Sequence, residues 1–136
     1  MNWGYCAFNL TCNLLVPLIM IGFGWRFMQK PPRDINGTYG YRTSMSMKNQ
    51  DTWDFAHRTC GQVWWTVGWA MLPLAVLAWV RTLSYSVGDM GFMCAAITSL
   101  EAVVLIVTII PVEWSLYKTI TRMEPDGEEG LTCVPW

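Results

Sequence analysis

The sequence is poor in charge. Only 14% of its 136 residues are Asp, Glu, Lys or Arg, whereas soluble domains carry about 25%. The formal net charge is −1, which disfavours a strongly basic protein that binds nucleic acid directly. Hydrophobic residues make up 53% of the chain. A typical soluble protein and a disordered chain are therefore both disfavoured.

Residues that hold metals or perform catalysis are also scarce. The chain has a single histidine, His57, and its five cysteines show no Cys-x-x-Cys spacing. A structural metal centre needs several such ligands close together, so we predict no metal and no other cofactor. No nucleophile with a neighbouring base is visible, and the sequence does not predict an enzyme.

The sequence contains instead three long apolar runs, at residues 3–25, 60–80 and 90–112, in which Glu101 is the one charged residue. A helix needs about 20 apolar residues to cross a bilayer, and a helix pairs its own backbone groups there. We therefore expect an all-α integral membrane bundle of three transmembrane helices. No positive charge precedes the first run, so it is interpreted as a retained anchor and not as a signal peptide.

The distribution of Lys and Arg predicts the orientation. Residues 26–59 hold six of them and residues 113–136 hold two, against Arg81 alone on the other side. Positive charge favours the cytoplasmic side, so we expect the N-terminus outside and the first loop and C-terminus in the cytoplasm. The membrane domain is predicted over residues 1–123, followed by an acidic, solvated tail over residues 124–136.

The cysteines follow this topology. Cys6 and Cys94 come near the outer surface, where a disulfide between them and two free buried thiols are both open alternatives. Cys60 and Cys133 are expected to face the reducing cytoplasm.

The loop at residues 26–59 carries signals of a defined structure. Pro31 and Pro32 end the first helix, and Asn36-Gly37 predicts a turn. Asn49 or Asp51 is expected to cap a new helix. After it, apolar residues recur at helical spacing and predict a short amphipathic helix, either separate from the second span or continuous with it. These residues are Trp53, Ala56, His57 and Cys60.

The same loop resembles the SdpI family of bacterial membrane proteins. The family hallmark is an Asn, a Gly-x-Arg-Thr, a Trp farther along and a Gly that leads into the next apolar helix. This chain has the series in order, as Asn36, Gly40, Arg42, Thr43, Trp53 and Gly61, with Ala56-His57 between the last two. The segment Pro111–Leu116 also looks like the Glu-x-x-Leu ending of the family, with Glu113 as its Glu.

The resemblance implies a bacterial inner-membrane protein that confers immunity to a secreted, membrane-active peptide toxin, by binding the toxin or shielding its target. The best-known members have extra spans and are thought to capture a transcriptional repressor at the membrane. The alternative function is therefore a sensor or scaffold that recruits a cytoplasmic partner, such as a repressor, through the first loop. The expected partners are membrane lipids, a peptide toxin, a repressor and a second copy of the chain.

Two loop residues have open interpretations. Arg42, with Thr43 beside it, either contacts a ligand, a lipid phosphate or a partner through its planar fork of donors, or ties the loop to the helices. His57 could act as a general base or a metal ligand, but no second ligand or nucleophile accompanies it. We favour a structural or interfacial histidine.

Glu101 lies at the middle of the third run, where a charge costs about 2.5 to 3.5 kcal/mol. Asn13 lies at a similar depth, and Thr66 is nearer the cytoplasm. One interpretation is a protonated carboxyl group hydrogen-bonded to such a neighbour. The other is a proton relay in a small proton-coupled transporter, which is our third candidate function. A small-residue patch on the same span suits self-association, and it consists of Ala95, Ala96 and Ser99.

Overall fold

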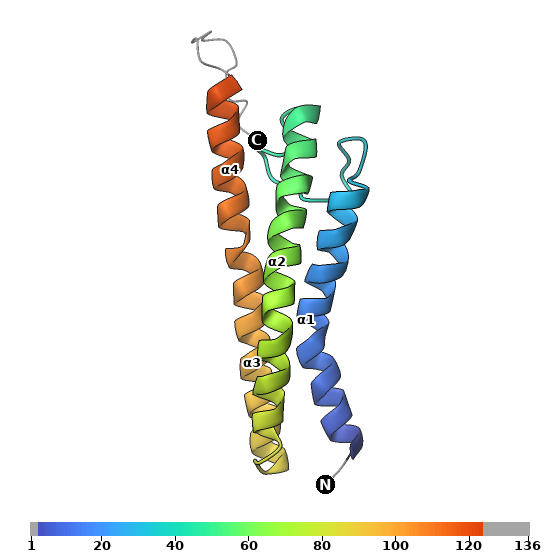
Figure 1. Ribbon diagram of the computed structural model, residues 1–136, viewed down its shortest axis with the longest axis vertical. Coiled ribbons are helices and arrows are strands. Elements are labelled where there is room, and N and C mark those ends of the chain that lie inside the picture. The colour runs from blue at the N-terminus through green and yellow to red at the C-terminus, as the bar shows by residue number, and fades with distance from the viewer. Residues whose placement is uncertain (1–2, 124–136) are drawn as a thin grey trace.

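The computed structural model describes residues 3–123, which form four α-helices (Figure 1). The helices are α1 (Trp3–Gln29), α2 (Gln50–Thr82), α3 (Val87–Val107) and α4 (Ile109–Met123). α4 continues the direction of α3, so the molecule consists of three long rods. All three rods are long and apolar enough to cross a membrane. The prediction of an all-α protein with three transmembrane helices is confirmed.

The second rod begins with a complete capping box. The Asn49 side chain accepts a hydrogen bond from the Thr52 N–H at 2.8 Å, and the Thr52 hydroxyl accepts one from the Asn49 N–H at 3.1 Å. This exchange satisfies two donors that a helix start leaves free, so Asn49 and not Asp51 is the cap. α2 then runs without a break to Thr82. The expected amphipathic helix is therefore continuous with the second span.

The third rod is longer than the apolar run that predicts it. α3 begins at Val87 behind a Ser86 cap, and α4 extends to Met123. The rod is interrupted at Thr108, three residues before Pro111. Proline has no N–H to give to the carbonyl group of the preceding turn, so the helix restarts with Pro111 in its first turn.

Close packing of α1 against α2 depends on glycine. A Cβ atom on Gly24 would lie 2.6 Å from the Trp65 backbone nitrogen, and one on Gly61 would lie 2.9 Å from the Gly24 carbonyl oxygen. Small residues let helix backbones approach in this way in membranes. The predicted patch of Ala95, Ala96 and Ser99 is exposed on α3, and self-association through it stays a prediction.

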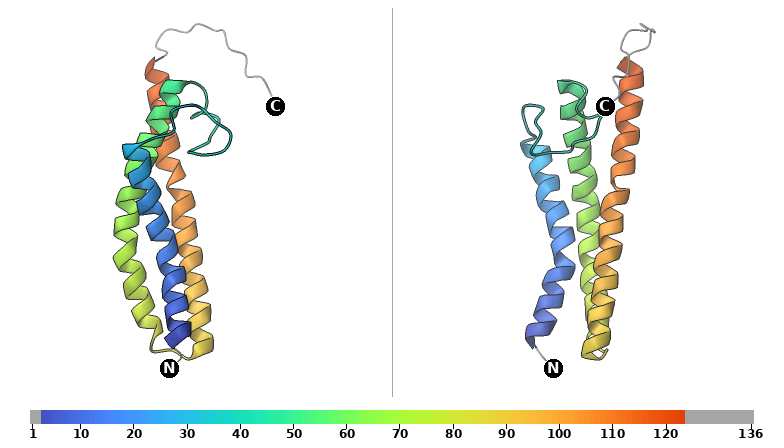
Figure 2. Two further views of the ribbon diagram at one scale, coloured as in Figure 1. Left: turned by 90° about the vertical axis from the view of Figure 1, so that its right-hand side faces the viewer. Right: turned by 180° about the vertical axis from the view of Figure 1, so that it is seen from behind.

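The segment between α1 and α2 folds back across the ends of these helices (Figure 2). Beneath it lies the core at this end of the bundle, to which the loop, α1, α2 and α4 all contribute. The buried members of this core are Phe27, Tyr41, Ala56, Cys60, Val112 and Leu116. The loop is therefore part of the packed structure and fixes the position of the candidate site.

Candidate ligand groove under the first loop

His57 is the central support of the loop. Its side chain is fully buried. Nε2 accepts the backbone N–H of Tyr41 at 2.8 Å, and Nδ1 lies 2.8 Å from the carbonyl oxygen of Trp53. Because a carbonyl group only accepts, Nδ1 carries the proton and the imidazole is neutral. Both ring nitrogens are occupied, which supports the structural interpretation of His57.

Two further hallmark residues fit around this imidazole. Gly40 has a φ of 122°, and a Cβ atom placed there would collide with His57 Nε2, so the position needs glycine for its angle and its size. Trp53 is fully buried, with its ring centroid 4.3 Å from that of His57. Its indole Nε1 donates to the Pro32 carbonyl oxygen at 2.9 Å. Trp53 therefore ties the start of the loop to α2.

Asn36 and Thr43 shape the two turns of the loop. The Asn36 side-chain oxygen accepts the N–H groups of Thr38 and Tyr39, at 3.1 and 2.8 Å. The Thr43 hydroxyl accepts the N–H of Ser46 at 3.2 Å, while the Ser46 hydroxyl accepts the N–H of Thr43 at 2.9 Å. Side chains of this kind replace backbone partners in turns. Both hallmark residues therefore act on the loop itself.

Tyr41 links the loop to α4, and the sequence reasoning missed this residue. Its hydroxyl donates to Glu113 Oε1 at 2.9 Å. Burial and this hydrogen bond raise the pKa of Tyr41 far above its usual range, so the phenol stays a donor. The one sequence signal for this link was the resemblance to the Glu-x-x-Leu ending, because its Glu is Glu113, the partner of Tyr41. Its Leu is the fully buried Leu116.

Arg42 differs from the other hallmark residues. Its side chain is exposed, and within residues 3–123 its guanidinium group forms no hydrogen bond, ion pair or ring contact. Arg42 lines a groove of about 380 Å³ between the loop and the helices. The groove wall is apolar and largely aromatic, and it includes Ile19, Phe23, Phe27, Tyr39, Trp64 and Ile109.

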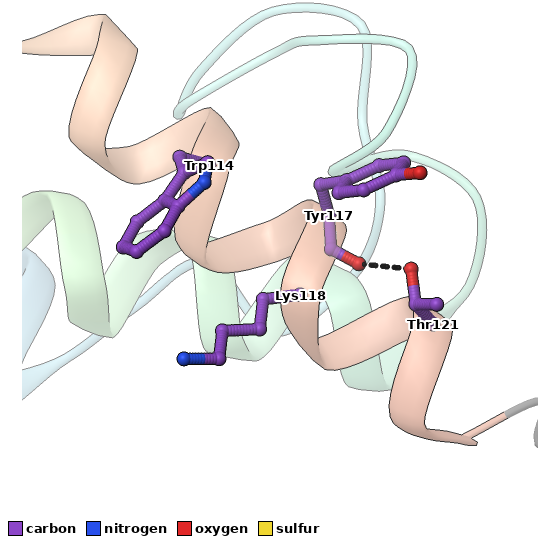
Figure 3. A pocket seen from close by; sticks show the side chains of 4 residues that line it. All are labelled: Trp114, Tyr117, Lys118 and Thr121. Atoms are coloured by element: carbon purple, nitrogen blue, oxygen red, sulfur yellow. Dashed lines mark hydrogen bonds between the residues drawn. The ribbon is translucent and has the colours of Figure 1, made fainter.

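A second depression lies on α4 alone (Figure 3) and has a volume of about 290 Å³. Two contacts join its lining residues. The Lys118 ammonium group lies 5.4 Å from the centroid of the Trp114 ring, and the Thr121 hydroxyl donates to the Tyr117 carbonyl oxygen at 2.8 Å. An exposed aromatic and lysine pair of this kind is typical of a membrane interface.

In the apolar part of the bundle, Asn13 joins α1 to α3. Its amide nitrogen donates to the Asn9 carbonyl oxygen at 3.0 Å and to Cys94 Sγ at 3.1 Å, and its oxygen accepts from the Thr98 hydroxyl at 3.3 Å. Cys6 and Cys94 have free, buried thiols, so the structure has no disulfide between them.

Two other predictions concern Cys60 and Cys133. Cys60 is fully buried, because α2 directs it into the core of the bundle. That it lies on the reducing cytoplasmic side stays a prediction. Cys133 and the acidic tail at residues 124–136 lie outside the described residues.

Glu101 is 5% exposed, and its Oε2 atom has no hydrogen-bond partner among the described residues. The expected hydrogen bond to Asn13 or Thr66 is wrong. Asn13 bonds to Asn9, Cys94 and Thr98 instead, and the exposed Thr66 donates to its own helix at the Gln62 carbonyl oxygen. Glu101 lines a small apolar groove of about 190 Å³ between α2 and α3. Among residues 3–123, no group of three or more His, Cys, Asp or Glu side chains could hold a metal ion.

Comparison with known proteins gives one match. The model of the SdpI/YfhL protein family matches residues 33–115, a range that includes the loop hallmark, His57 and Glu113. Neither the curated proteins nor the solved structures include a match to this chain. Because the matched range covers more than half of the sequence, the chain belongs to the SdpI/YfhL protein family.

Proposed function

We propose that this protein confers resistance to a membrane-active peptide toxin, and that the Arg42 groove is the site at which it does so. Membership of the SdpI/YfhL family supports a membrane protein of the immunity type. The finer proposal rests on one observation. Of the six loop residues singled out from the sequence, five hold the loop in shape. Arg42 alone presents a charge that has no partner within residues 3–123.

The groove has the chemistry of a site for an amphiphile. Its wall offers aromatic and aliphatic surface from α1, α2 and the start of α4, and Arg42 adds a cation. A peptide that acts on membranes is amphiphilic, and so is the lipid that it attacks. Occupation of the groove by either molecule accounts for resistance, by capture of the toxin or by shielding of its target. In the predicted orientation the groove lies at the cytoplasmic leaflet of the bilayer.

A survival assay tests the proposal. A sensitive bacterial host expresses the full chain, the Arg42→Ala variant or the Arg33→Ala variant, at equal membrane levels, and is challenged with the secreted peptides of the producing strain. Arg33 is an exposed arginine of the same loop that does not line the groove. We expect protection by the wild type and by Arg33→Ala but not by Arg42→Ala. Equal protection by both variants would contradict the role of the groove.

Two other candidate functions each have one supporting observation. The Tyr41–Glu113 hydrogen bond connects the loop to α4, which gives a sensor or scaffold a route from the groove to the end of the third rod. The Glu101 carboxyl oxygen that has no partner among the described residues supports a small proton-coupled transporter, because ionisable groups inside a membrane often serve ion pathways. Arg42→Ala and Glu101→Gln separate these functions, since only transport depends on Glu101.

A further inference from the structure

We propose that the Arg42 groove binds one anionic phospholipid, with the lipid phosphate on the guanidinium group and an acyl chain along the exposed face of α1. The inference rests on the proposed function, because it names the occupant of the same groove.

The charge of the groove selects an anion. Among the described residues, Arg42 is the only charged one in the lining, and no carboxylate group within residues 3–123 forms an ion pair with its guanidinium group. A guanidinium group presents a planar fork of donors that matches two phosphate oxygens at once. The free hydrogen-bonding capacity of Arg42 therefore fits a phosphate better than it fits a neutral group.

The apolar wall fits a hydrocarbon chain. Phe23 and Ile19 lie one helical turn apart on α1, and their side chains are 40% and 41% exposed. They lead from the groove toward the middle of the apolar run at residues 3–25. A lipid whose phosphate lies on Arg42 would place an acyl chain over these two side chains without leaving the bilayer. One phospholipid molecule would thereby pair with the Arg42 cation and cover the apolar surface.

The backbone of the loop argues against an extended peptide as the occupant. The N–H groups of Thr38 and Tyr39 are bonded to Asn36, and that of Tyr41 is bonded to His57. Peptides that add to a protein as a strand need a free, extended backbone edge. Gly40, with a φ of 122°, interrupts such an edge. Besides the side chains of Thr38 and Thr43, the lining offers one cation and apolar surface, and this combination suits a lipid.

Lys118 provides the matched control. It is a basic residue beside aromatic rings (Figure 3), but its ammonium group already lies over the Trp114 ring and its depression belongs to α4 alone. A general attraction of anionic lipids to positive charge would depend on Lys118 and Arg33 as much as on Arg42. Binding at a specific site in the groove would depend on Arg42 alone among these three residues.

Native mass spectrometry of the full chain in detergent tests this inference, with phosphatidylglycerol as the anionic probe and phosphatidylcholine as the zwitterionic probe. The wild type should retain one phosphatidylglycerol molecule under conditions that remove phosphatidylcholine. Arg42→Ala should weaken phosphatidylglycerol binding about tenfold or more, because it removes a charge-assisted pair. Arg33→Ala and Lys118→Ala should bind as the wild type does. Glycerol phosphate, which lacks acyl chains, should not displace the lipid at equal concentration.

Equal retention of the two lipids by the wild type, or equal phosphatidylglycerol binding by Arg42→Ala and Arg33→Ala, would overturn the lipid site. Displacement by glycerol phosphate would likewise overturn it, in favour of a site for the free anion. The survival assay separates this inference from the proposed function. Loss of lipid binding with full protection would sustain the lipid site and contradict the immunity role of the groove. Loss of protection with unchanged lipid binding would assign the groove to the toxin and overturn the lipid site.

Discussion

The imidazole of His57 holds the backbone of Tyr41, because its Nε2 atom accepts the Tyr41 N–H at 2.8 Å across sixteen residues of sequence. The single histidine of the chain therefore acts as the support of a loop. The consequence for function is that Arg42, the next residue after Tyr41, is presented at a fixed place beside the groove. The predictions below test this support, its links and the residue that it presents.

Removal of the imidazole should loosen the loop. His57→Leu leaves the Tyr41 N–H buried without a partner, which costs about 1–3 kcal/mol. Hydrogen exchange in detergent micelles should show faster exchange at Tyr41 and its loop neighbours, with little change in α3. Unchanged protection of the Tyr41 amide would show that His57 is not the support we describe.

Gly40→Ala should destabilise the loop through two effects at one position. The residue has a positive φ, and the added methyl group would collide with His57. We expect a loss of about 1–3 kcal/mol, seen as faster cleavage of the loop by a protease. Gly37→Ala is the matched control, since a Cβ atom there comes no nearer than 4.0 Å to the Arg42 side chain. Equal cleavage of the two variants would contradict this account.

The Tyr41–Glu113 link predicts sensitivity to alkali. The pKa of Tyr41 is raised in the folded protein by burial and by the Glu113 hydrogen bond. An unfolded loop therefore ionises first, and the stability from this link is present below about pH 10 and is lost as the pH rises past it. Loop cleavage between about pH 9 and pH 11 should accelerate more in the wild type than in Tyr41→Phe. Identical pH profiles of loop cleavage in the wild type and in Tyr41→Phe would contradict a stabilising role for the Tyr41–Glu113 hydrogen bond.

Glu101→Gln should leave protection intact, because the groove lies under the loop and Glu101 lines a different groove between α2 and α3. The same survival assay measures this variant, with membrane levels checked by immunoblot. Loss of protection in Glu101→Gln together with protection by Arg42→Ala would favour proton-coupled transport.

The sequence predicts well what depends on neighbouring residues. Apolar runs long enough to cross a bilayer locate the three rods, and the Asn49 cap and the stripe that contains Trp53 and His57 follow from local helical spacing. The ends of the rods are less predictable, because the third rod continues past its apolar run to Met123 on polar residues.

The contacts that build the groove could not be predicted in this way. Tyr41 and Glu113 are 72 residues apart, and only the packing of α4 against α2 brings them together. The prediction of a hydrogen-bond partner for Glu101 was wrong for a similar reason, since the rotation of each helix about its axis decides which polar side chains meet. The similar depth of Asn13 and Glu101 in the membrane suggested that they are neighbours. The orientation of α1 instead directs the Asn13 side chain to Cys94 and Thr98, with which it forms hydrogen bonds.

The central claim is that Arg42 serves a ligand and not the fold. The most direct measurement compares Arg42→Ala with the wild type in one preparation, by thermal unfolding in detergent and by survival under toxin challenge. Since the side chain is exposed and has no partner in the described part of the chain, its removal should change stability by less than about 0.5 kcal/mol, while protection is lost. A variant that protects as well as the wild type, or that loses protection only in proportion to lost folded protein, would contradict the account.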